Sequence, residues 1–320
     1  MDVEINEIQR QIKLMVPEEV NEICRTLDLL EGIYVQIHWA IYELIENSDN
    51  SGSKNVGFEL KEDKLLVRND GLEFSIDDFK RICSVNTSIN RNGLVDRAFG
   101  LGFKSVFSFS NDVRIYSGKS GIRFCKHKEE KLWKVFPYKI ENQNFQKEDN
   151  TIFEFDLGDK QGIMSKTLFE ISPKILLFLK SVRTIVIEDF VSGDTITLEK
   201  IIRKKNNLKI VTLRKIINKE VCESWDYVCY SKEFLIPESI SDKEQTRVSI
   251  AVPLSRESDL VSIYRKIYRV VGDENAGFML SGDFITTMSF DELVDNDWNA
   301  WLLDSVLDYI NLELKSGLTI

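Results

Sequence analysis

Two segments of this chain hold residues whose types and spacing suit phosphate chemistry. In the first, residues 40–50, Glu43 and Asn47 stand four positions apart and would share one edge of a helix. Hydrolysis of a nucleoside triphosphate needs Mg²⁺ on the phosphate oxygens and a group that orients or deprotonates water. We therefore predict Glu43 as the base and Asn47 as the Mg²⁺ ligand, because an amide oxygen suits the metal. Glu46 and Asn50 have the same spacing, so an ordinary polar helix edge is the alternative.

The second segment is glycine-bearing and reads FGLGFKSVF over residues 99–107. Its glycines allow the backbone to approach phosphate closely, and the start of a following helix carries partial positive charge. Lys104 and Ser105 lie in the first turn of that predicted helix, where they could add direct phosphate contacts. A lone Gly-X-Gly is also common in helix–strand packing. The pattern indicates a nucleotide site because it follows the Glu43 and Asn47 pair in the sequence. The predicted phosphate-binding residues are Gly100, Leu101, Gly102, Phe103, Lys104 and Ser105.

The elements that must position these segments follow from hydrophobic periodicity. The first thirty residues are predicted to be helical, and a longer helix with one apolar stripe runs to residues 51–53. A β-hairpin at 56–69 follows, then a short helix capped by Ser75, a loop at 85–96 and a helix from Gly102. Four strands are predicted at VRIYSG, GIRFCKH, LWKVFPYK and TIFEFDL. This order predicts an α+β sandwich in which helices cover one face of a mixed sheet.

After about Asp159 the pattern restarts. A helix through Leu179 leads into a hairpin that turns at residues 192–194, and further strands precede a closing amphipathic helix at 298–310. We therefore expect two domains, one at residues 1–160 and a second, smaller α+β domain at residues 161–320.

Composition limits the classes of function. The net charge of −10 disfavours a nucleic acid as the main ligand, since phosphate binding would need a local basic patch. One basic run surrounds residues 203–219, for which we favour a solvated face over a nucleic-acid site. Five cysteines without CxxC spacing, and only two histidines, argue against a zinc site or a histidine-based triad. Without a signal peptide or an apolar run near the roughly 20 residues of a membrane span, we expect a cytoplasmic protein without a membrane segment.

Together the motifs resemble those of the GHKL ATPases, a family that includes heat-shock chaperones, DNA gyrase B subunits, MutL proteins and sensor histidine kinases. The similarity is greatest to the sacsin-type, chaperone-like branch. ELIENSDN resembles the first ATP motif of the family, NDGLEFSIDDF the second, FGLGFKSVF the third, and NTIFEF with Thr151 the last. These motifs span residues 33–155, and GFMLSGDFITTMSFDEL and DWNAWL in the second half are similar in a less specific way.

The resemblance implies a Bergerat-type pocket for ATP and Mg²⁺ between the sheet and the helices. In that pocket Glu43 takes the general-base position, Asn47 takes the Mg²⁺ position, and the stretch at 86–98 takes the ATP lid. Relatives of this type close the lid and dimerise on binding ATP, then reopen after hydrolysis, so a homodimer is implied. The residues implied in nucleotide binding beyond the phosphate loop are Asn69, Asp70, Gly71, Thr87, Ser88 and Thr151.

The chain departs from the family pattern at several positions. Asn69 stands where the family has a carboxylate that accepts from the adenine amino group, which leaves the base specificity open. Arg97 and Asn150 replace family glycines, and Phe290 stands where related chains have an arginine. These changes favour slow hydrolysis and keep open an alternative, a nucleotide-gated binding or scaffolding module with little or no turnover. A third alternative, an interaction domain with a relic pocket, predicts no nucleotide binding.

The resemblance and the absence of an effector signature predict which groups and partners act with the nucleotide. In many relatives the second domain supplies a cation to the terminal phosphate, and the candidates here are Arg247, Arg256, Arg265 and Lys266. No nuclease, protease or methyltransferase signature occurs, so any effector activity is expected in a protein partner or a domain outside this chain. The resemblance also implies a role in nucleic-acid processing or in defence against mobile DNA.

Overall fold

The computed structural model describes residues 2–33, 36–84, 102–126, 131–141, 151–205, 208–241, 244–255, 261–265, 268–272, 277–287 and 292–311. The chain forms two compact units that interleave along the sequence. The first unit consists of Met1–Ser172, Lys180–Leu198 and Lys215–Cys222, and the second of Pro173–Leu179, Glu199–Arg214 and Glu223–Ile320. The division therefore differs from the predicted one at residue 160, because β7 (Thr184–Asp189) pairs in parallel with β1 (Asn55–Leu60) and returns the chain to the first unit.

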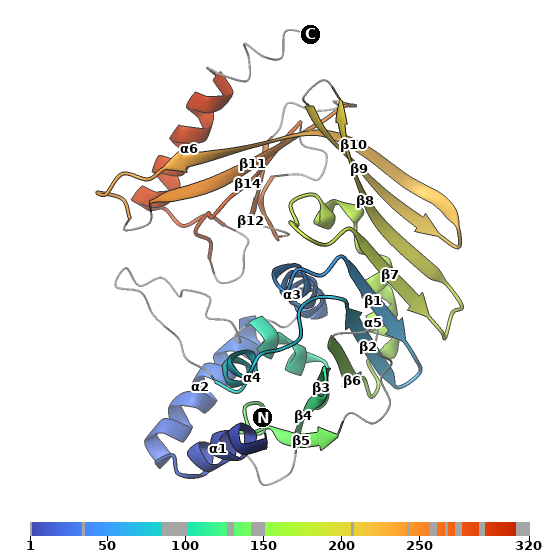
Figure 1. The fold of residues 1–320 in the computed structure, drawn as a ribbon, viewed down its shortest axis with the longest axis vertical. Coiled ribbons are helices and arrows are strands. Elements are labelled where there is room, and N and C mark those ends of the chain that lie inside the picture. Colours follow the sequence, from blue (N-terminus) through green and yellow to red (C-terminus); the bar gives the residue numbers. More distant parts are fainter. Residues whose placement is uncertain are drawn as a thin grey trace. The chain divides into compact units, whose positions relative to one another are not determined.

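The first unit contains a mixed sheet covered by helices, which confirms the predicted α+β class (Figure 1). The strands lie in the order β7-β1-β2-β6-β3-β4-β5. The other strands are β2 (Lys64–Asn69), β3 (Asp112–Ser117), β4 (Ser120–Cys125), β5 (Tyr138–Glu141) and β6 (Thr151–Asp156). The helices are α1 (Asp2–Lys13), α2 (Pro17–Ile33), α3 (Ile37–Asn50), α4 (Ile76–Ile82), the 3₁₀ helix η1 (Gly102–Ser108) and α5 (Gln161–Phe169).

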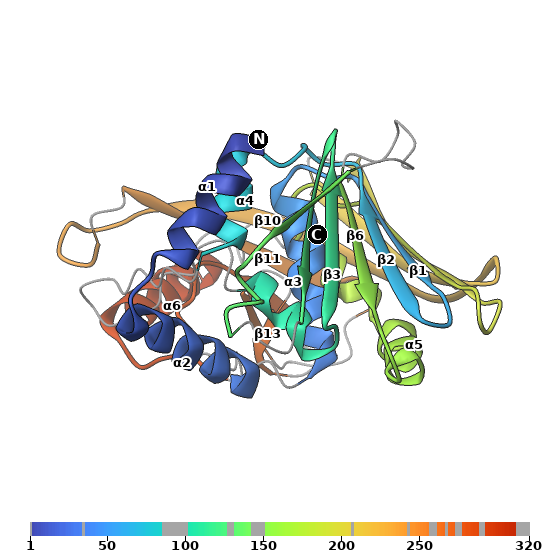
Figure 2. The same ribbon diagram turned by 90° about the horizontal axis from the view of Figure 1, so that it is seen from below.

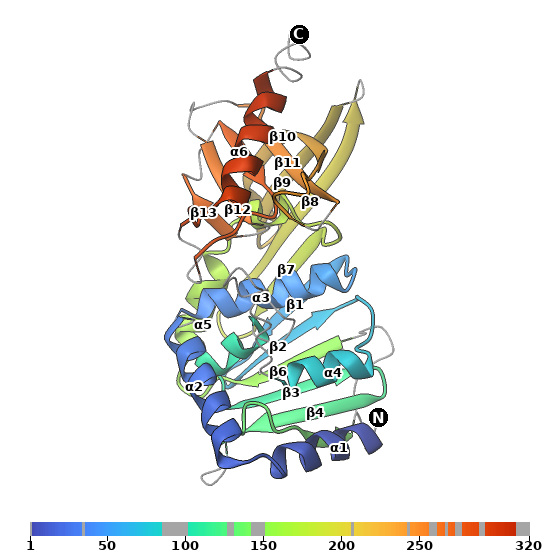
Figure 3. The same cartoon turned by 90° about the vertical axis from the view of Figure 1, so that its left-hand side faces the viewer.

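Alternation along the strands directs apolar side chains toward the helices. In β2, Leu65 and Val67 are fully buried, whereas Lys64 and Arg68 on the opposite face are only partly buried. The apolar stripe of α3 packs on this sheet face, and its buried members are Ala40, Ile41, Leu44 and Ile45. Figures 2 and 3 show α1, α3 and α4 on the same side of these strands. The core of the first unit therefore lies between the sheet and this helical layer.

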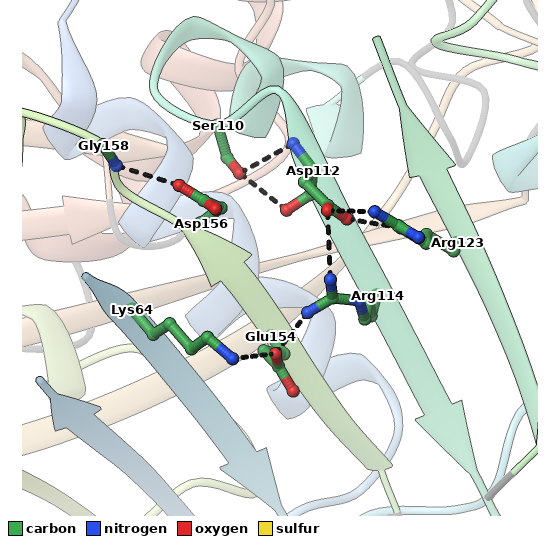
Figure 4. Close-up of polar contacts among 8 residues, drawn as sticks. All are labelled: Lys64, Ser110, Asp112, Arg114, Arg123, Glu154, Asp156 and Gly158. Atoms are coloured by element: carbon green, nitrogen blue, oxygen red, sulfur yellow. Dashed lines mark hydrogen bonds and ion pairs between the residues drawn. The ribbon is translucent and has the colours of Figure 1, made fainter. Parts of the chain in front are cut away.

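The opposite face of the sheet carries a row of ion pairs, which we call the charge ladder (Figure 4). Lys64 on β2 pairs with Glu154 on β6 at 3.0 Å, and Glu154 also pairs with Arg114 on β3. Asp112 on β3 pairs with Arg114 at 3.0 Å and with Arg123 on β4 at 2.5 Å. Arg114 and Arg123 are register partners, so Asp112 offsets the repulsion between two like charges that face each other.

Three predicted elements of the first 180 residues differ in the structure. The segment LWKVFPYK is a strand only at its end, where β5 begins at Tyr138. The helix expected from Gly102 is the short 3₁₀ helix η1. The helix expected to reach Leu179 ends at Phe169, and a 3₁₀ turn, η2 (Pro173–Leu176), follows. Pro173 explains this break, because proline lacks an N–H group and disfavours a helical residue before it.

The second unit is a sheet backed by α6 (Asp297–Tyr309). Its strands, the first three of which also extend into the first unit, are β8 (Thr195–Lys205), β9 (Leu208–Ile217), β10 (Glu220–Leu235), β11 (Gln245–Pro253), β12 (Val261–Arg265), β13 (Tyr268–Val271) and β14 (Phe278–Ser281). Leu302 and Val306 of α6 pack against Val248, Ile250 and Leu280 of the sheet. The sequence did not predict the short strands β12 and β13.

One buried carboxylate fixes α3 to the segment that leads into β7. Asp49, in the last turn of α3, accepts hydrogen bonds from the N–H groups of Lys180, Ser181 and Val182 at 3.0, 2.6 and 2.9 Å. Only Arg183 separates these three residues from β7, and Asp49 is buried. The end of α3 is therefore tied to the segment that feeds the parallel strand.

We predict that Asp49→Ala lowers the free energy of unfolding by about 2–4 kcal/mol, because three backbone donors lose a charged acceptor. Urea denaturation of the native chain and the variant measures the difference. Asp63→Ala, at the exposed turn between β1 and β2, is the control and should change stability by less than about 0.5 kcal/mol. Equal effects of the two substitutions would contradict the role given to Asp49.

Candidate functional site

The predicted base Glu43 and the predicted loop residue Gly102 lie in direct contact. Glu43 projects from the middle of α3 and is 7% exposed. A Cβ atom added to Gly102 would lie 1.9 Å from Glu43 Oε2 and 2.4 Å from its Cδ atom, so the carboxylate fills the space beside the glycine. Glycine at 102 is thus required by packing, and it exposes the start of η1 to the predicted base.

A second glycine contacts the same helix farther along. A Cβ atom at Gly71 would lie 2.0 Å from the Oγ atom of Ser51, the residue that ends α3. The N–H group of Leu72 also donates to the carbonyl oxygen of Ser51 at 2.9 Å. Eight residues of α-helix separate Glu43 from Ser51, or about 12 Å along the axis. The partly buried Asn47 lies midway between the two glycine contacts.

Polar side chains meet where three neighbouring strands end. Asn69 of β2 and Thr151 of β6 are register partners, and Thr151 is also the partner of Ser117 on β3. All three side chains are buried. The hydroxyl oxygens of Thr151 and Ser117 are 2.8 Å apart, and Ser117 Oγ accepts from the N–H group of Phe74 at 2.8 Å. The structure thus brings the predicted residues Asn69 and Thr151 together.

Ser117 was missed by the sequence prediction. It occupies an inward-facing position of β3 whose preceding inward residues, Val113 and Ile115, are apolar and fully buried. A polar residue that ends an otherwise apolar strand face is the signal that could have identified it. Asn69 Oδ1 accepts from the N–H group of Gly71 at 3.1 Å, which fixes the amide at the same end of the sheet.

Asp70, predicted to contact the nucleotide, holds the turn between α3 and β1. One carboxylate oxygen accepts from Ser53 Oγ at 2.6 Å and from the N–H groups of Lys54 and Asn55 at 2.7 and 2.9 Å. The other oxygen accepts from Asn55 Nδ2 at 2.7 Å. Partial burial acts to raise the pKa of Asp70, but the hydrogen bonds from Asn55, Ser53 and Lys54 outweigh it and lower the pKa.

Lys104 and Ser105, predicted as direct phosphate contacts, make hydrogen bonds within the fold. Lys104 is buried, and its ammonium group donates to the carbonyl oxygen of Ile82 and to that of Lys134, the latter at 3.0 Å. Burial lowers the pKa of Lys104 to about 8, although the nearby thiol of Cys83 acts to raise it. Ser105 Oγ donates to the carbonyl oxygen of Gly102 at 2.5 Å. In this structure both side chains are engaged by backbone carbonyls.

The remaining predicted residues divide into one core residue and a group that the structure does not describe. Phe103 is a core residue whose ring packs near those of Phe107, Phe124 and Phe153. Thr87, Ser88, Gly100 and Leu101, together with the predicted lid at 86–98, lie outside the described residues. The same holds for Arg97, Asn150, Arg256, Lys266 and Phe290.

A metal ion at this site would depend on few protein ligands. Among the described residues, no group of three or more His, Cys, Asp or Glu side chains is placed to hold a metal ion. Mg²⁺ commonly takes one or two protein oxygens and completes its shell with water and substrate phosphates, a pattern that a single amide such as Asn47 can serve.

Within the described ranges, no helix is long and apolar enough to span a bilayer.

A cavity of about 290 Å³ lies elsewhere in the first unit, between α5 and the strands β1 and β7. Leu60, Ser165 and Asp189 are among the residues that line it, and Ser165 Oγ donates to Asp189 at 2.6 Å. None of the residues predicted to bind the nucleotide lines this cavity. It is therefore separate from the surface of α3 that holds Glu43 and Asn47.

Comparisons with known proteins give distant similarities. No protein-family model matches the chain. Protein NO VEIN of Arabidopsis thaliana is 22% identical over 325 residues, which cover 90% of this chain and 12% of that protein. The protein named "Putative type II restriction enzyme HgiDII" of Herpetosiphon aurantiacus is 26% identical over 104 residues, which cover 29% of this chain and 17% of that protein. The chain thus matches only a small part of each relative's length.

Among solved structures, the B-subunit of the DNA gyrase from Myxococcus xanthus is similar with a TM-score of 0.47 and 7% sequence identity. The match covers 84% of this chain and 86% of that chain. Similarity at this level supports no conclusion about function.

We predict that Gly102→Ala displaces the Glu43 carboxylate and lowers the free energy of unfolding by about 1–3 kcal/mol, because the added methyl group overpacks a filled space. Thermal or urea unfolding measures the loss, and combining the change with Glu43→Ala should restore part of it. Gly162→Ala in α5 is the matched control, since a Cβ atom there meets nothing within 4 Å. A Gly102→Ala chain as stable as this control would refute the contact.

A further prediction concerns Asp70. Because the hydrogen bonds of the folded state lower the pKa of Asp70 below its value in the unfolded chain, Asp70 contributes stability above that unfolded-state pKa, and the contribution is lost as pH falls through the folded-state pKa. Asp70→Asn should therefore lower the melting temperature by a few degrees at neutral pH, with a smaller deficit in acid. Calorimetry from neutral pH to about pH 2 tests this, with Asp63→Asn as control. A deficit independent of pH would contradict the prediction.

Proposed function

We propose that the chain binds ATP with Mg²⁺ along the surface of α3 that Gly71 and Gly102 contact, and that it hydrolyses the nucleotide slowly. The observation that carries this proposal is the contact between the buried Glu43 carboxylate and Gly102. A carboxylate held against a glycine at the start of η1 lies where a water molecule and a phosphate group could meet it. Only glycine leaves room for both the carboxylate and a close ligand at that position.

The roles of the other residues follow from their positions. The Asn69–Thr151 end of the sheet is polar and buried, which suits the base of a nucleotide, and Gly71 beside Ser51 allows close approach there. Asn47, one helical turn after Glu43, is assigned to Mg²⁺. When bound, the ion would neutralise charge on the phosphate oxygens. Glu43 would orient the attacking water and accept its proton.

The resemblance to the GHKL ATPases extends this proposal beyond the site. In that family ATP closes a lid and brings two chains together, so we propose a lid at 86–98 and a nucleotide-dependent homodimer in the cytoplasm. The restriction enzyme among the sequence relatives supports a setting in defence against mobile DNA. Any cleavage activity is assigned to a partner protein or to a domain outside this chain.

Binding without turnover is a second candidate function, and one observation favours it. The ammonium group of Lys104 is directed at two backbone carbonyls, so this cation is not available to stabilise charge that develops on a phosphate. A site without that cation can hold a nucleotide through backbone groups and Mg²⁺ yet cleave it very slowly. ATP would then act as a ligand that selects one conformation.

We predict that Glu43→Gln lowers the rate of ATP hydrolysis by about 10²–10⁴-fold and leaves ATP affinity within a few fold, because glutamine keeps the shape but cannot act as a base. Phosphate release measures turnover, and calorimetry with Mg²⁺ measures binding. Glu46→Gln, the same change three residues later on α3, is the matched control and should leave both unchanged.

The same experiment separates the alternatives. Equal turnover by the native chain and Glu43→Gln would remove Glu43 as the base. ATP binding by the native chain without phosphate release would establish the binding-only function, and Asn47→Ala should then abolish the Mg²⁺ dependence of affinity. A native chain that binds no ATP would overturn both candidates.

A further inference from the structure

The cavity of about 290 Å³ beside α5 lies at the carboxyl ends of two parallel strands. Leu60 is the last residue of β1 and Asp189 is the last residue of β7, and the two are register partners in the parallel pair. In proteins with parallel strands, ligands often bind in a crevice at this edge of the sheet. All residues that line the cavity belong to the first unit.

One part of the cavity lining is apolar. It consists of Leu60, Leu168, Ile187 and Ile196, which are buried, together with Phe169 of α5, which is 46% exposed. A ligand with a hydrocarbon group could therefore remove apolar surface from water here, including one face of an exposed aromatic ring.

Two carboxylates of the lining lie opposite each other without a cation. Asp189 and Asp194 stand at the two ends of the turn that joins β7 to β8, where the N–H group of Asp189 donates to the carbonyl oxygen of Asp194 at 2.9 Å. Neither side chain makes an ion pair with another described residue. Like charges that face each other across a hairpin destabilise it. In the charge ladder, Asp112 offsets such repulsion between Arg114 and Arg123, but the cavity lacks the equivalent counter-charge.

Asp189 keeps its charge although it is buried. Its carboxylate accepts hydrogen bonds from Ser165 Oγ at 2.6 Å and from the N–H groups of Val191 and Ser192 at 2.9 and 3.1 Å. Burial acts to raise the pKa of Asp189, but hydrogen bonds from Ser165, Ser192 and Val191 outweigh it and lower the pKa. These donors are neutral, whereas a buried carboxylate is usually paired with a cation. A bound cation would supply that pair.

We propose that the cavity binds a small organic cation, a primary ammonium ion that carries an apolar group. The ammonium group donates to the carboxylates of Asp189 and Asp194, and the hydrocarbon contacts the apolar lining. Lys166 and Glu170, the other charged residues of the lining, pair with each other at 3.9 Å, so the two aspartates provide the unbalanced charge. A metal ion would leave the apolar lining uncovered, and no three His, Cys, Asp or Glu side chains of the described chain are placed to hold one. This inference is independent of the proposed ATP site.

The test titrates the full chain, at neutral pH and without nucleotide, with three probes that share one hydrocarbon group. Phenethylamine is a cation, phenethyl alcohol is neutral and hydrocinnamate is an anion. The backbone NMR signals of Val191 and Ser192, in the turn beside the cavity, report binding. We expect phenethylamine to shift these signals with a Kd of about 1 mM, and phenethyl alcohol to bind at least about tenfold more weakly. Hydrocinnamate should not bind, because its charge is repelled.

Asp194→Asn removes one charge while its amide oxygen can still accept from Asn218 Nδ2, as Asp194 does at 2.8 Å. We expect this variant to bind phenethylamine about three- to tenfold more weakly. Without ligand its melting temperature should rise by about 1–3 °C, because the repulsion from Asp189 is relieved. Glu188→Gln is the matched control and should change neither quantity, since Glu188 is an exposed residue of β7 that does not line the cavity.

Combining Asp189→Asn with Asp194→Asn should remove the preference for phenethylamine over phenethyl alcohol. Should that chain fail to fold, the affinity and melting temperature of Asp194→Asn decide the question. Unchanged signals of Val191 and Ser192 at about 20 mM phenethylamine would overturn the proposal. So would equal affinity for phenethylamine and phenethyl alcohol, which would make the cavity an apolar site without selection for charge. Displacement of phenethylamine by an equal concentration of Mg²⁺ would assign the carboxylates to a metal ion instead.

Discussion

The placement of α3 on the sheet is the constraint on which the first unit depends. The helix is held at its end by Asp49, which accepts three backbone hydrogen bonds from the segment before β7. At Ser51 and at Glu43 it is contacted by glycines that leave no room for a side chain. These contacts come from chain segments far apart in sequence, so the surface between Glu43 and Ser51 exists only in the complete first unit. A rotation of α3 would separate the carboxylate from η1 and remove the site.

Several lysines in this chain are buried and donate to backbone carbonyl oxygens. Lys104, Lys200 and Lys215 each place a buried ammonium group on carbonyl oxygens at or near the end of a helical turn. Such carbonyl oxygens lack hydrogen-bond donors within their helix and carry partial negative charge. An ammonium group donates the missing hydrogen bond and offsets that charge. The low pKa of Lys104 reflects the cost of burying that charge. A basic residue beside a glycine loop is thus weak evidence of a phosphate contact until its partners are known.

Much of the fold could be predicted from the sequence where the determining interactions are local. The stripe of α3, the β1–β2 hairpin and the cap of α4 by Ser75, which exchanges hydrogen bonds with Asp78, are encoded within a few residues. The resemblance placed Glu43 and Gly102 in one implied pocket, but the sequence did not predict their direct contact. The partners of Asp70 and Lys104 could not be predicted, because they lie far away in sequence or are backbone atoms that composition does not reveal. The break at Pro173 could have been found from the proline itself.

The charge ladder has a consequence for how the strands find their alignment. Each charge of the ladder lies on the face of its strand opposite the core, and the pairs between strands form only when neighbouring strands are correctly aligned. A slip of one residue between β3 and β6 would turn Arg114 toward the phenylalanines of the core and away from Glu154. The ladder therefore favours the native alignment of the strands. A slip would bury charged side chains on the core face and expose apolar side chains on the opposite face.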